Sequence, residues 1–269
     1  MDKATEDSSE TNLKKTARIA IIGCAVLEDE VRHFLEAIDV VSSVYFLKQG
    51  LHDEPDRLRR ELQEAIDKVE AEDIADVIAL VYGFCSRGIE GVSTRRCQLV
   101  VARAHDCITL LLGSKEAYAE YVEKNPGTYW YSMGWNKSTT MPGPERHAKL
   151  KKQYEEKFDS DDAEYLLEME EMWMKEYSRA THVDLGVGDG RTDQEYTKAC
   201  ADWLGWGFDA QKGDPTLLKD LLSGRWDDER FLLVGPGQTF KGSADERVIK
   251  PTACASCPLD KEPENKQKQ

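Results

Sequence analysis

The sequence lacks long apolar runs and any excess of basic residues. No run approaches the ~20 apolar residues that a membrane-spanning helix needs. The first sixteen residues also lack the apolar core of a secretory signal. Lys and Arg number 36 against 51 Asp and Glu, so the net charge is -15, which opposes binding to nucleic acid or to an anionic membrane. We therefore expect a cytoplasmic protein with no nucleic-acid and no membrane partner.

The seven cysteines have no spacing typical of a disulfide framework, and their number is odd. Disulfides are rare in a reducing compartment. Metal binding, thiolate chemistry and simple burial remain as roles for these residues. A single C-x-x-C pair, Cys254 and Cys257, lies near the end of the chain. It has no second pair with which to complete a zinc or iron-sulfur pattern, so we assign it no role.

Short apolar runs rich in β-branched residues predict strands that are buried on both faces. In the first half they cover residues 18–23, 40–47, 77–82 and 99–102, and helical patterns separate them. In the second half, strands are expected at 182–185 and 231–234 and helices at 194–204 and 215–223. The alternation predicts an α/β protein with two Rossmann-like lobes, mainly parallel sheets and a ligand cleft between them.

Changes in composition divide the chain into five expected parts. They are a disordered tail at 1–17, a first α/β lobe at 18–128, an aromatic crossing and long helices at 129–180, a second α/β lobe at 181–250, and a polar tail at 251–269. Within the long helices, Leu166, Met169, Met172 and Trp173 recur at helical spacing. We interpret this stripe as packing rather than as a cofactor site.

Thiols and imidazoles follow the four strands of the first lobe. Cys24, His52 and Cys85 come after the first three strands, and His105 and Cys107 follow the fourth. The carboxyl ends of neighbouring parallel strands share one edge of a sheet, and ligands bind there in open α/β folds. Thiolate and imidazole are the donors that zinc prefers. We therefore predict a site for zinc or another divalent metal at Cys24, Cys85, His105 and Cys107, although separate burial of each residue is the alternative.

Other residues near these turns are expected to contact the substrate or to orient a ligand. They are His52, Tyr82, Asp106 and Trp135. Asp106 either orients His105 or caps the helix that follows it. Cys97 precedes the fourth strand, so we expect it at the opposite edge of the sheet.

A glycine-rich turn in the second half suggests a different site. Asp184, Gly186, Gly188 and Gly190 resemble the first motif of S-adenosylmethionine-dependent methyltransferases, where glycines let the backbone approach the cofactor. Asp209 stands about where an acid that binds the ribose would follow. Only 60 residues remain after Asp209, too few for the usual remainder of that fold. We keep S-adenosylmethionine as a third option.

Several motifs resemble the family called domain of unknown function 1638. The most specific are Tyr82-Gly83-Phe84-Cys85 and His105-Asp106-Cys107-Ile108. Cys24 with Glu28 and Glu30, the stretches 52–55, 112–114 and 126–135, and residues 213–227 add to the resemblance, which covers about 19–237. Such proteins occur in anaerobic archaea and bacteria, often beside corrinoid proteins and methylamine-type methyltransferases.

The resemblance implies a link to one-carbon or methyl-transfer metabolism and a corrinoid protein or a methyltransferase as partner. In the enzyme hypothesis, the metal activates a thiol that attacks a methyl group carried by a corrinoid protein. In the alternative, the protein is a non-catalytic accessory that binds or delivers a corrinoid. The aromatic residues Tyr129, Trp130, Tyr131 and Trp135 would then line the cleft.

Overall fold

A five-stranded sheet in the order β2-β1-β3-β4-β8 forms the centre of the computed structural model, which describes residues 17–254. Four strands are parallel, and β8 pairs antiparallel with β4. The strands are β1 (Ile19–Cys24), β2 (Val41–Leu47), β3 (Val77–Val81), β4 (Gln98–Ala102) and β8 (Phe231–Val234). Every residue of β1 and β3 is buried, as expected for parallel strands that are covered on both faces.

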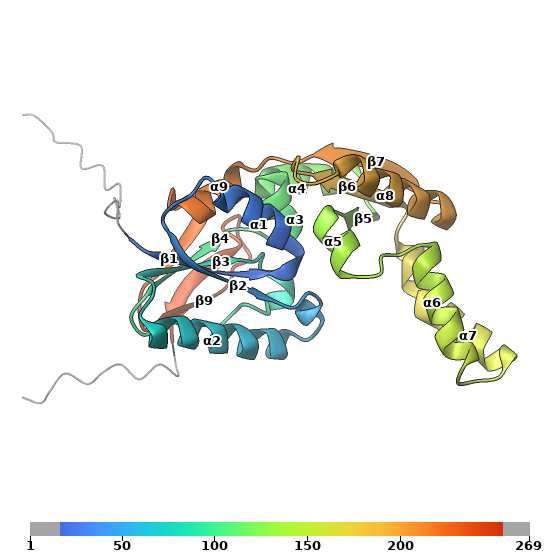
Figure 1. The fold of residues 1–269 in the computed structure, drawn as a ribbon, viewed down its shortest axis with the longest axis horizontal. Coiled ribbons are helices and arrows are strands. Elements are labelled where there is room, and N and C mark those ends of the chain that lie inside the picture. Colours follow the sequence, from blue (N-terminus) through green and yellow to red (C-terminus); the bar gives the residue numbers. More distant parts are fainter. Residues whose placement is uncertain (1–16, 255–269) are drawn as a thin grey trace, which may run out of the picture.

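Helices cover both faces of this sheet (Figure 1). On one face lies α2 (Pro55–Glu72), whose Leu58, Leu62, Ile66 and Val69 are buried at helical spacing. On the other face lie α1 (Glu28–Leu35), α9 (Thr216–Ser223) and α3 (Cys107–Leu112). The apolar rows predicted from the sequence therefore fill the two layers of the core around the sheet.

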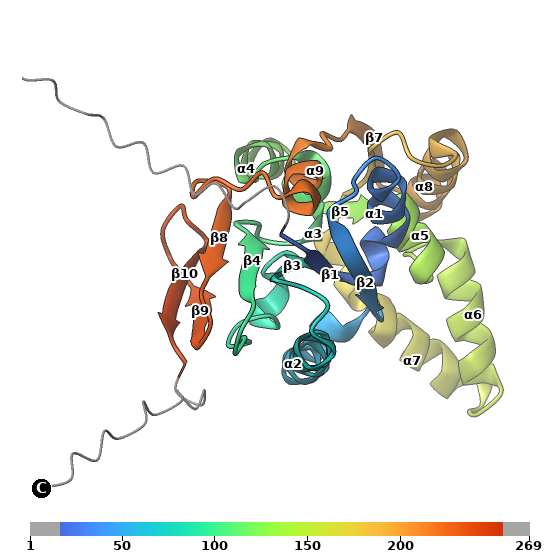
Figure 2. The ribbon, with the colours of Figure 1, turned by 60° about the vertical axis from the view of Figure 1, so that its left-hand side comes forward.

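A second parallel sheet has the order β5-β6-β7. Its strands are β5 (Thr128–Tyr131), β6 (Arg179–Asp184) and β7 (Gly207–Lys212), with α4 (Lys115–Lys124), α5 (Met133–Ser138) and α8 (Gly190–Leu204) nearby. A separate antiparallel pair, β9 (Gln238–Gly242) and β10 (Ile249–Ala253), lies beside β8 (Figure 2).

Several elements differ from the sequence prediction. The aromatic segment expected as a crossing contains a strand, β5, which pairs with β6. The run at 231–234, expected in the second lobe, returns to the first sheet as its antiparallel edge strand. Local pattern shows that a run is buried but does not show which sheet it joins. The strand pair β9–β10 was not predicted, and part of it falls within the expected polar tail.

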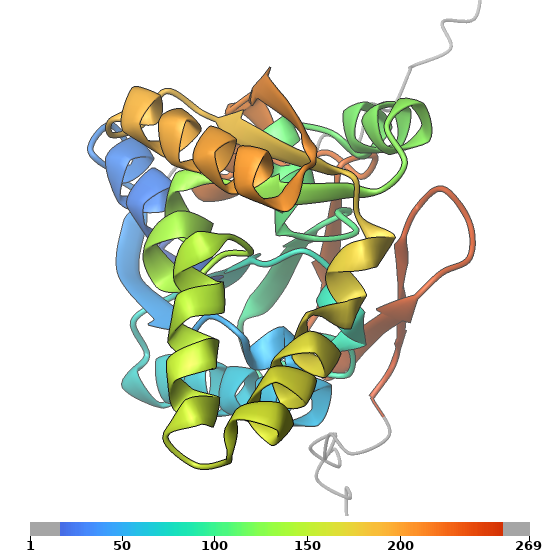
Figure 3. The same cartoon turned by 90° about the vertical axis from the view of Figure 1, so that its right-hand side faces the viewer.

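Helices α6 (Pro144–Glu155) and α7 (Ser160–Glu171) form a hairpin that projects from the body of the protein in Figure 1 and faces the viewer in Figure 3. The predicted stripe on α7 is only partly packed. Met169 and Met172 are exposed, and Ala163 and Leu167 take the buried positions.

The chain is thus a mixed α/β protein with a mainly parallel central sheet. Within residues 17–254, no helix combines the length and the apolar character needed to cross a membrane. Nearly all of the expected tail at 1–17, and the expected tail at 251–269 from residue 255 onward, including Cys257, lie outside the described residues.

Candidate functional site

The strand order creates a switch point between β1 and β3. After β1 the chain moves to one side to form β2, and it then crosses to the other side to form β3. In open α/β sheets, ligands bind outside the carboxyl ends of the strands at such a point. Cys24 is the last residue of β1, and Cys85 follows β3. The topology therefore places two of the predicted thiols at the position where this fold class binds ligands.

The structure brings three predicted thiols together at this edge. The Sγ atoms of Cys85 and Cys107 are 3.7 Å apart, and the Cys107 thiol also hydrogen-bonds to Cys24. These hydrogen bonds, together with burial, raise the pKa of Cys107 well above its usual value. The Cys107 hydrogen bond lowers the pKa of Cys24 despite its burial. Cys24, Cys85 and Cys107 therefore lie near one another at this edge, and the pKa of Cys24 is lowered whereas that of Cys107 is raised.

A close backbone approach holds Cys85 and Cys107 together. A Cβ atom on Gly83 would lie 2.1 Å from the carbonyl carbon of Asp106, so only glycine fits between the two loops. The backbone amides of Phe84 and Cys85 donate to the carbonyls of Ala104 and His105. The loop after β3 is thereby tied to the loop after β4, from which Cys107 begins α3.

The segment from Cys85 to Arg87 has an unusual backbone. Its three consecutive residues have φ values of 22°, 48° and 62°. Positive φ costs a residue with a side chain of the order of 1 kcal/mol or more, and such strain concentrates at functional sites. This turn positions the Cys85 side chain against Cys107.

A cavity of about 750 Å³ opens at the thiols. It is within the size range of small-molecule sites, roughly 300–1,000 Å³. All eight residues predicted as metal ligands, substrate contacts or orienting groups line it: Cys24, Cys85, His105, Cys107, His52, Tyr82, Asp106 and Trp135. Residues that were far apart in the sequence therefore surround a single space.

Aromatic side chains form much of the cavity wall. Tyr129, Trp130 and Trp135 were predicted for such a wall and do line it. Tyr131 does not, because it is buried in a separate core cluster, where its hydroxyl donates to the Pro142 carbonyl. The sequence analysis did not single out Tyr118, whose ring packs between those of His105 and Trp130.

The two cavity histidines are more exposed than Cys24 and Cys107. His105 is exposed, and its ring centroid lies 6.1 Å from that of Tyr118. His52 is partly exposed beside Asp53. Asp106 caps α3 by accepting from the Thr109 amide, so the capping role that we considered for it is confirmed. Burial raises the pKa of the Asp106 carboxyl.

The Tyr82 hydroxyl is buried without a hydrogen-bond partner in the described chain. Its side chain is 3% exposed, and the hydroxyl interacts electrostatically with Cys24, Cys107 and Cys85. Burial, followed by these thiols, raises the pKa of Tyr82 far above its usual value, so the hydroxyl keeps its proton. An unsatisfied buried donor beside three thiols favours an anionic or electron-rich partner there, a thiolate or a bound ligand.

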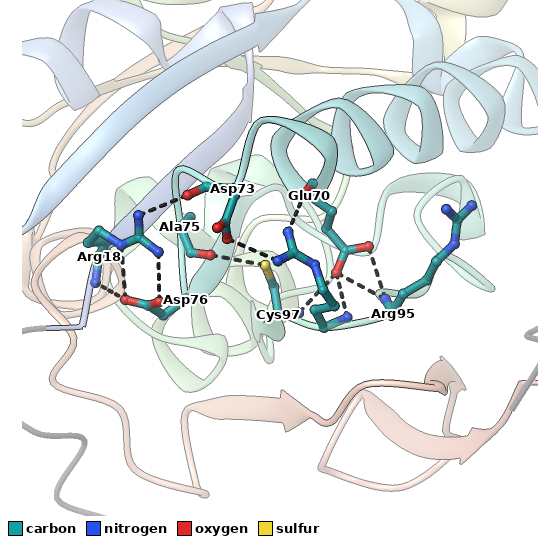
Figure 4. A network of polar contacts seen from close by, with 8 residues as sticks. Arg18, Glu70, Asp73, Ala75, Asp76, Arg95 and Cys97 are labelled. Atoms are coloured by element: carbon teal, nitrogen blue, oxygen red, sulfur yellow. Dashed lines mark hydrogen bonds and ion pairs between the residues drawn. The ribbon is translucent and has the colours of Figure 1, made fainter. Parts of the chain in front are cut away.

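The remaining described cysteines lie elsewhere, as expected. Cys97 is at the amino edge of the sheet, where its thiol donates to the Ala75 carbonyl at 3.3 Å. Its amide, like those of Arg95 and Arg96, donates to the Glu70 carboxylate (Figure 4). Cys200 belongs to the second core cluster. Cys254 follows β10, away from the three thiols.

The glycine-rich turn of the third hypothesis does not line this cavity. The Asp184 carboxylate accepts from the Gly186 amide at 2.7 Å, and a Cβ on Gly188 would lie 2.6 Å from the Met133 sulfur. Asp209 already accepts from Tyr121 at 2.6 Å. The acid expected to bind a ribose is therefore satisfied by the protein itself.

As the side chains stand, no group of three or more His, Cys, Asp or Glu residues between positions 17 and 254 is arranged to hold a metal ion. The Cys85 and Cys107 sulfur atoms lie 3.7 Å apart, but these thiols and His105 do not form such a group as they stand. A metal at this edge therefore requires side-chain rotation.

Comparison with known proteins supports the family resemblance. Neither the curated proteins nor the solved structures gave a match. A family described as Protein of unknown function (DUF1638) matches residues 46–222. This range includes Cys85, His105 and Cys107 but begins after Cys24. Because the match spans more than half of the 269 residues, the chain belongs to this family.

Proposed function

We propose that Cys24, Cys85 and Cys107 form a soft-metal site that serves methyl transfer. The observation that carries this proposal is the contact of three thiols from three separate strand ends at the wall of one cavity. We further propose that the two parallel sheets are Rossmann-like lobes and that the cavity between their residues is the ligand cleft. It is lined both by the strand ends of the first sheet and by Tyr129 and Trp130 of β5.

The donor set suits a thiophilic ion such as zinc. Two thiolates on one tetrahedral zinc ion, with bonds of about 2.3 Å, lie roughly 3.8 Å apart. The Cys85 and Cys107 sulfur atoms are 3.7 Å apart. His105, exposed at the cavity, is the candidate fourth donor of the resting site, and a substrate thiol would have to take the place of one of these four donors. When bound, the ion would lower the pKa of a substrate thiol.

The protein residues would have distinct tasks. The thiols must lose protons to bind the ion, so affinity should rise with pH. Tyr82 stays protonated and would donate a hydrogen bond to a thiolate or to a bound anion. The aromatic wall would hold the apolar part of a ligand and exclude water from the thiols.

The reaction we propose is transfer of a methyl group from a corrinoid protein to a substrate thiol. The substrate thiolate supplies the electron pair of the new sulfur-carbon bond. The methyl-cobalt bond breaks, and its electron pair remains on cobalt. Two observations support this methyl-transfer reaction. The first is the family resemblance, which implies a link to methyl-transfer metabolism, and the second is the cluster of thiols, which can bind a metal that activates a substrate thiol.

Metal analysis of protein purified without oxygen tests the site. We expect close to one zinc or similar ion per chain, and loss of most of it in Cys107→Ser. Cys97→Ser is the matched control, because Cys97 is buried at the opposite edge of the same sheet, and it should keep its metal. Less than about 0.2 ion per chain, unchanged in Cys107→Ser, would refute the site.

The second candidate function is non-catalytic binding or delivery of a corrinoid. The exposed imidazole of His105 beside the aromatic cavity wall favours it. Titration with cobalamin should then shift its visible spectrum, and His105→Ala should abolish the shift. His33→Ala is the control, since exposed His33 on α1 does not line the cavity. No spectral shift and no quenching of protein fluorescence would exclude this function.

A further inference from the structure

The projecting hairpin carries a row of apolar side chains that nothing in the described chain covers. Tyr165, Met169 and Met172 are 62%, 48% and 47% exposed. Their spacings of four and three residues place them on one side of α7 and of the short helix η4 (Met172–Glu176) that continues it. Ala163 and Leu167 form the buried side of the same helix. Helix α7 therefore has two apolar sides, and only one is used inside the protein.

Negative charge surrounds the exposed row. Helix α7 contains no Lys or Arg and six acidic residues, Asp161, Asp162, Glu164, Glu168, Glu170 and Glu171. Three of these have ion-pair partners: Glu168 pairs with Lys175, Glu170 with Arg146 and Glu171 with His147. In the part of the chain described, no ion pair is found for the other three, Asp161, Asp162 and Glu164. The surface thus combines flexible apolar side chains with uncompensated carboxylates.

We propose that this row, Tyr165, Met169 and Met172, is the docking surface for a basic amphipathic helix of another protein. Methionine adapts its shape to different apolar partners, which suits it to exposed binding surfaces. A helix that lays apolar residues on such a surface is a common mode of peptide recognition. Lys and Arg flanking its apolar side would pair with the free carboxylates of α7.

A second copy of this chain fits the surface poorly. Two α7 helices facing each other would bring like charges together. Helix α6 has more basic than acidic residues, but its exposed positions are Pro144, Glu145, Ala148, Lys149, Lys151, Lys152, Gln153 and Glu155, while Leu150 and Tyr154 are partly buried. It would offer charge without an apolar row.

The chain's own ends and a lipid surface are also poor occupants. Neither terminal stretch, 1–16 or 255–269, contains apolar residues at helical spacing. An anionic membrane would be repelled by the carboxylates of α7. Charge and apolar pattern together point to another protein.

The docking surface is connected to the cavity through the chain. Helix η4 begins at Met172 and ends at Glu176, and both Glu176 and the next residue, Tyr177, line the cavity. A partner bound at Met172 would therefore lie within one short helix of the cavity wall. The inference does not depend on the chemistry of the thiols.

Binding of a model peptide tests the surface. The probe is a fluorescein-labelled 14-residue peptide of Leu and Lys with its leucines on one helical side, and binding to the full chain is measured by fluorescence anisotropy. We expect Met169→Ser/Met172→Ser to weaken binding at least tenfold. Phe158→Ser is the matched control, because Phe158 is 45% exposed but outside the row, and it should bind as the unaltered chain does. Circular dichroism checks that all variants are folded.

Two further measurements decide between the occupants. A scrambled peptide of the same composition should bind at least tenfold more weakly than the amphipathic one. Equal binding of both peptides, or of the serine variant and the unaltered chain, would show attraction to acidic charge alone and overturn the proposal. No binding of the amphipathic peptide would also overturn it. Sedimentation that shows a dimer lost in the serine variant would assign the surface to a second copy instead.

Discussion

The two edges of the central sheet contain residues of the same types, but these residues differ in their hydrogen bonding. At the amino edge, Glu70 is 7% exposed and its carboxylate accepts hydrogen bonds from three backbone amides. At the carboxyl side, Glu30 on α1 is 3% exposed, and one of its carboxylate oxygens has no partner in the described chain. Cys97 and Cys107 differ in the same way, because Cys97 donates to a backbone carbonyl whereas Cys107 contacts two other thiols.

This difference separates structural groups from groups available for function. Burial alone would raise the pKa of both glutamates. At Glu70 the three amide donors overcome burial and lower the pKa. At Glu30 burial dominates, aided by Asp29 and Asp193, and raises the pKa to about 7. A buried polar group that the fold leaves unsatisfied costs stability, so its presence calls for another explanation.

The largest effect should come from removing the carboxylate at the amino edge. Glu70→Ala leaves three backbone amides without an acceptor, so we expect a loss of about 4 kcal/mol in the free energy of unfolding. Denaturant titration measures it. Glu64→Ala, an exposed position on the same helix, should change stability by less than about 0.5 kcal/mol. Equal effects of the two substitutions would contradict a structural role for the amino edge.

The next largest effect concerns the close approach at the carboxyl edge. In Gly83→Ala the new methyl group would overlap the backbone of Asp106, so the loops bearing Cys85 and Cys107 must separate. We expect a loss of about 3 kcal/mol in stability together with loss of bound metal. Gly50→Ala is a useful comparison, because a Cβ there meets nothing within 4 Å. Because φ at Gly50 is 91°, Gly50→Ala still strains the backbone, but the metal content of this variant should be unchanged. If the folded Gly83→Ala variant had a normal metal content, the metal site would not depend on the close approach of Gly83 to Asp106.

A pH-dependent effect should distinguish the two glutamates. Because the pKa of Glu30 is raised from 4.5 to about 7, its contribution to stability is fully present below pH 4.5 and is lost as pH rises through 7. Glu30→Gln lacks this loss, so it should exceed the unaltered chain in stability by about 3 kcal/mol at pH 8 and differ little at pH 4.5. Denaturant titrations at both pH values measure the difference.

Glu70 should show the opposite slope. Its lowered pKa means that its stabilisation is present above the unfolded pKa and is lost as pH falls through the folded pKa. Stability curves of Glu30→Gln and of the unaltered chain that remain parallel from pH 4.5 to 8 would show that Glu30 is not an unpaired buried acid.

The smallest effect is expected at Cys97. Burial, followed by Glu70, raises the pKa of Cys97 to about 11, so the thiol remains protonated near neutral pH and acts as a small donor. Cys97→Ser keeps a donor for the Ala75 carbonyl, and we expect a change of less than about 1 kcal/mol in stability. Thermal unfolding measures it. A larger loss would mean that sulfur packing at the amino edge matters more than the hydrogen bond.

The central sheet and much of the site were predictable because they depend on local pattern. Buried β-branched runs mark the parallel strands, and residues that follow such strands meet at one edge of a sheet. These patterns predict from the sequence alone that Cys24, Cys85 and Cys107 lie together and that Cys97 lies apart. The sequence could not show which sheet a short run joins, so the prediction that the strand at 231–234 belongs to the second lobe is wrong.

The sequence by itself determined which residues are buried, which follow strands and what chemistry their side chains offer. Only the tertiary structure decided which polar groups find partners. Glu30 and Glu70 are the same residue type on two helices, yet Glu70 accepts from three backbone amides of a distant segment, whereas one carboxylate oxygen of Glu30 has no partner in the described chain. The physical reason is that hydrogen bonding requires atoms within about 3 Å, and such contacts between distant segments depend on how helices and loops pack.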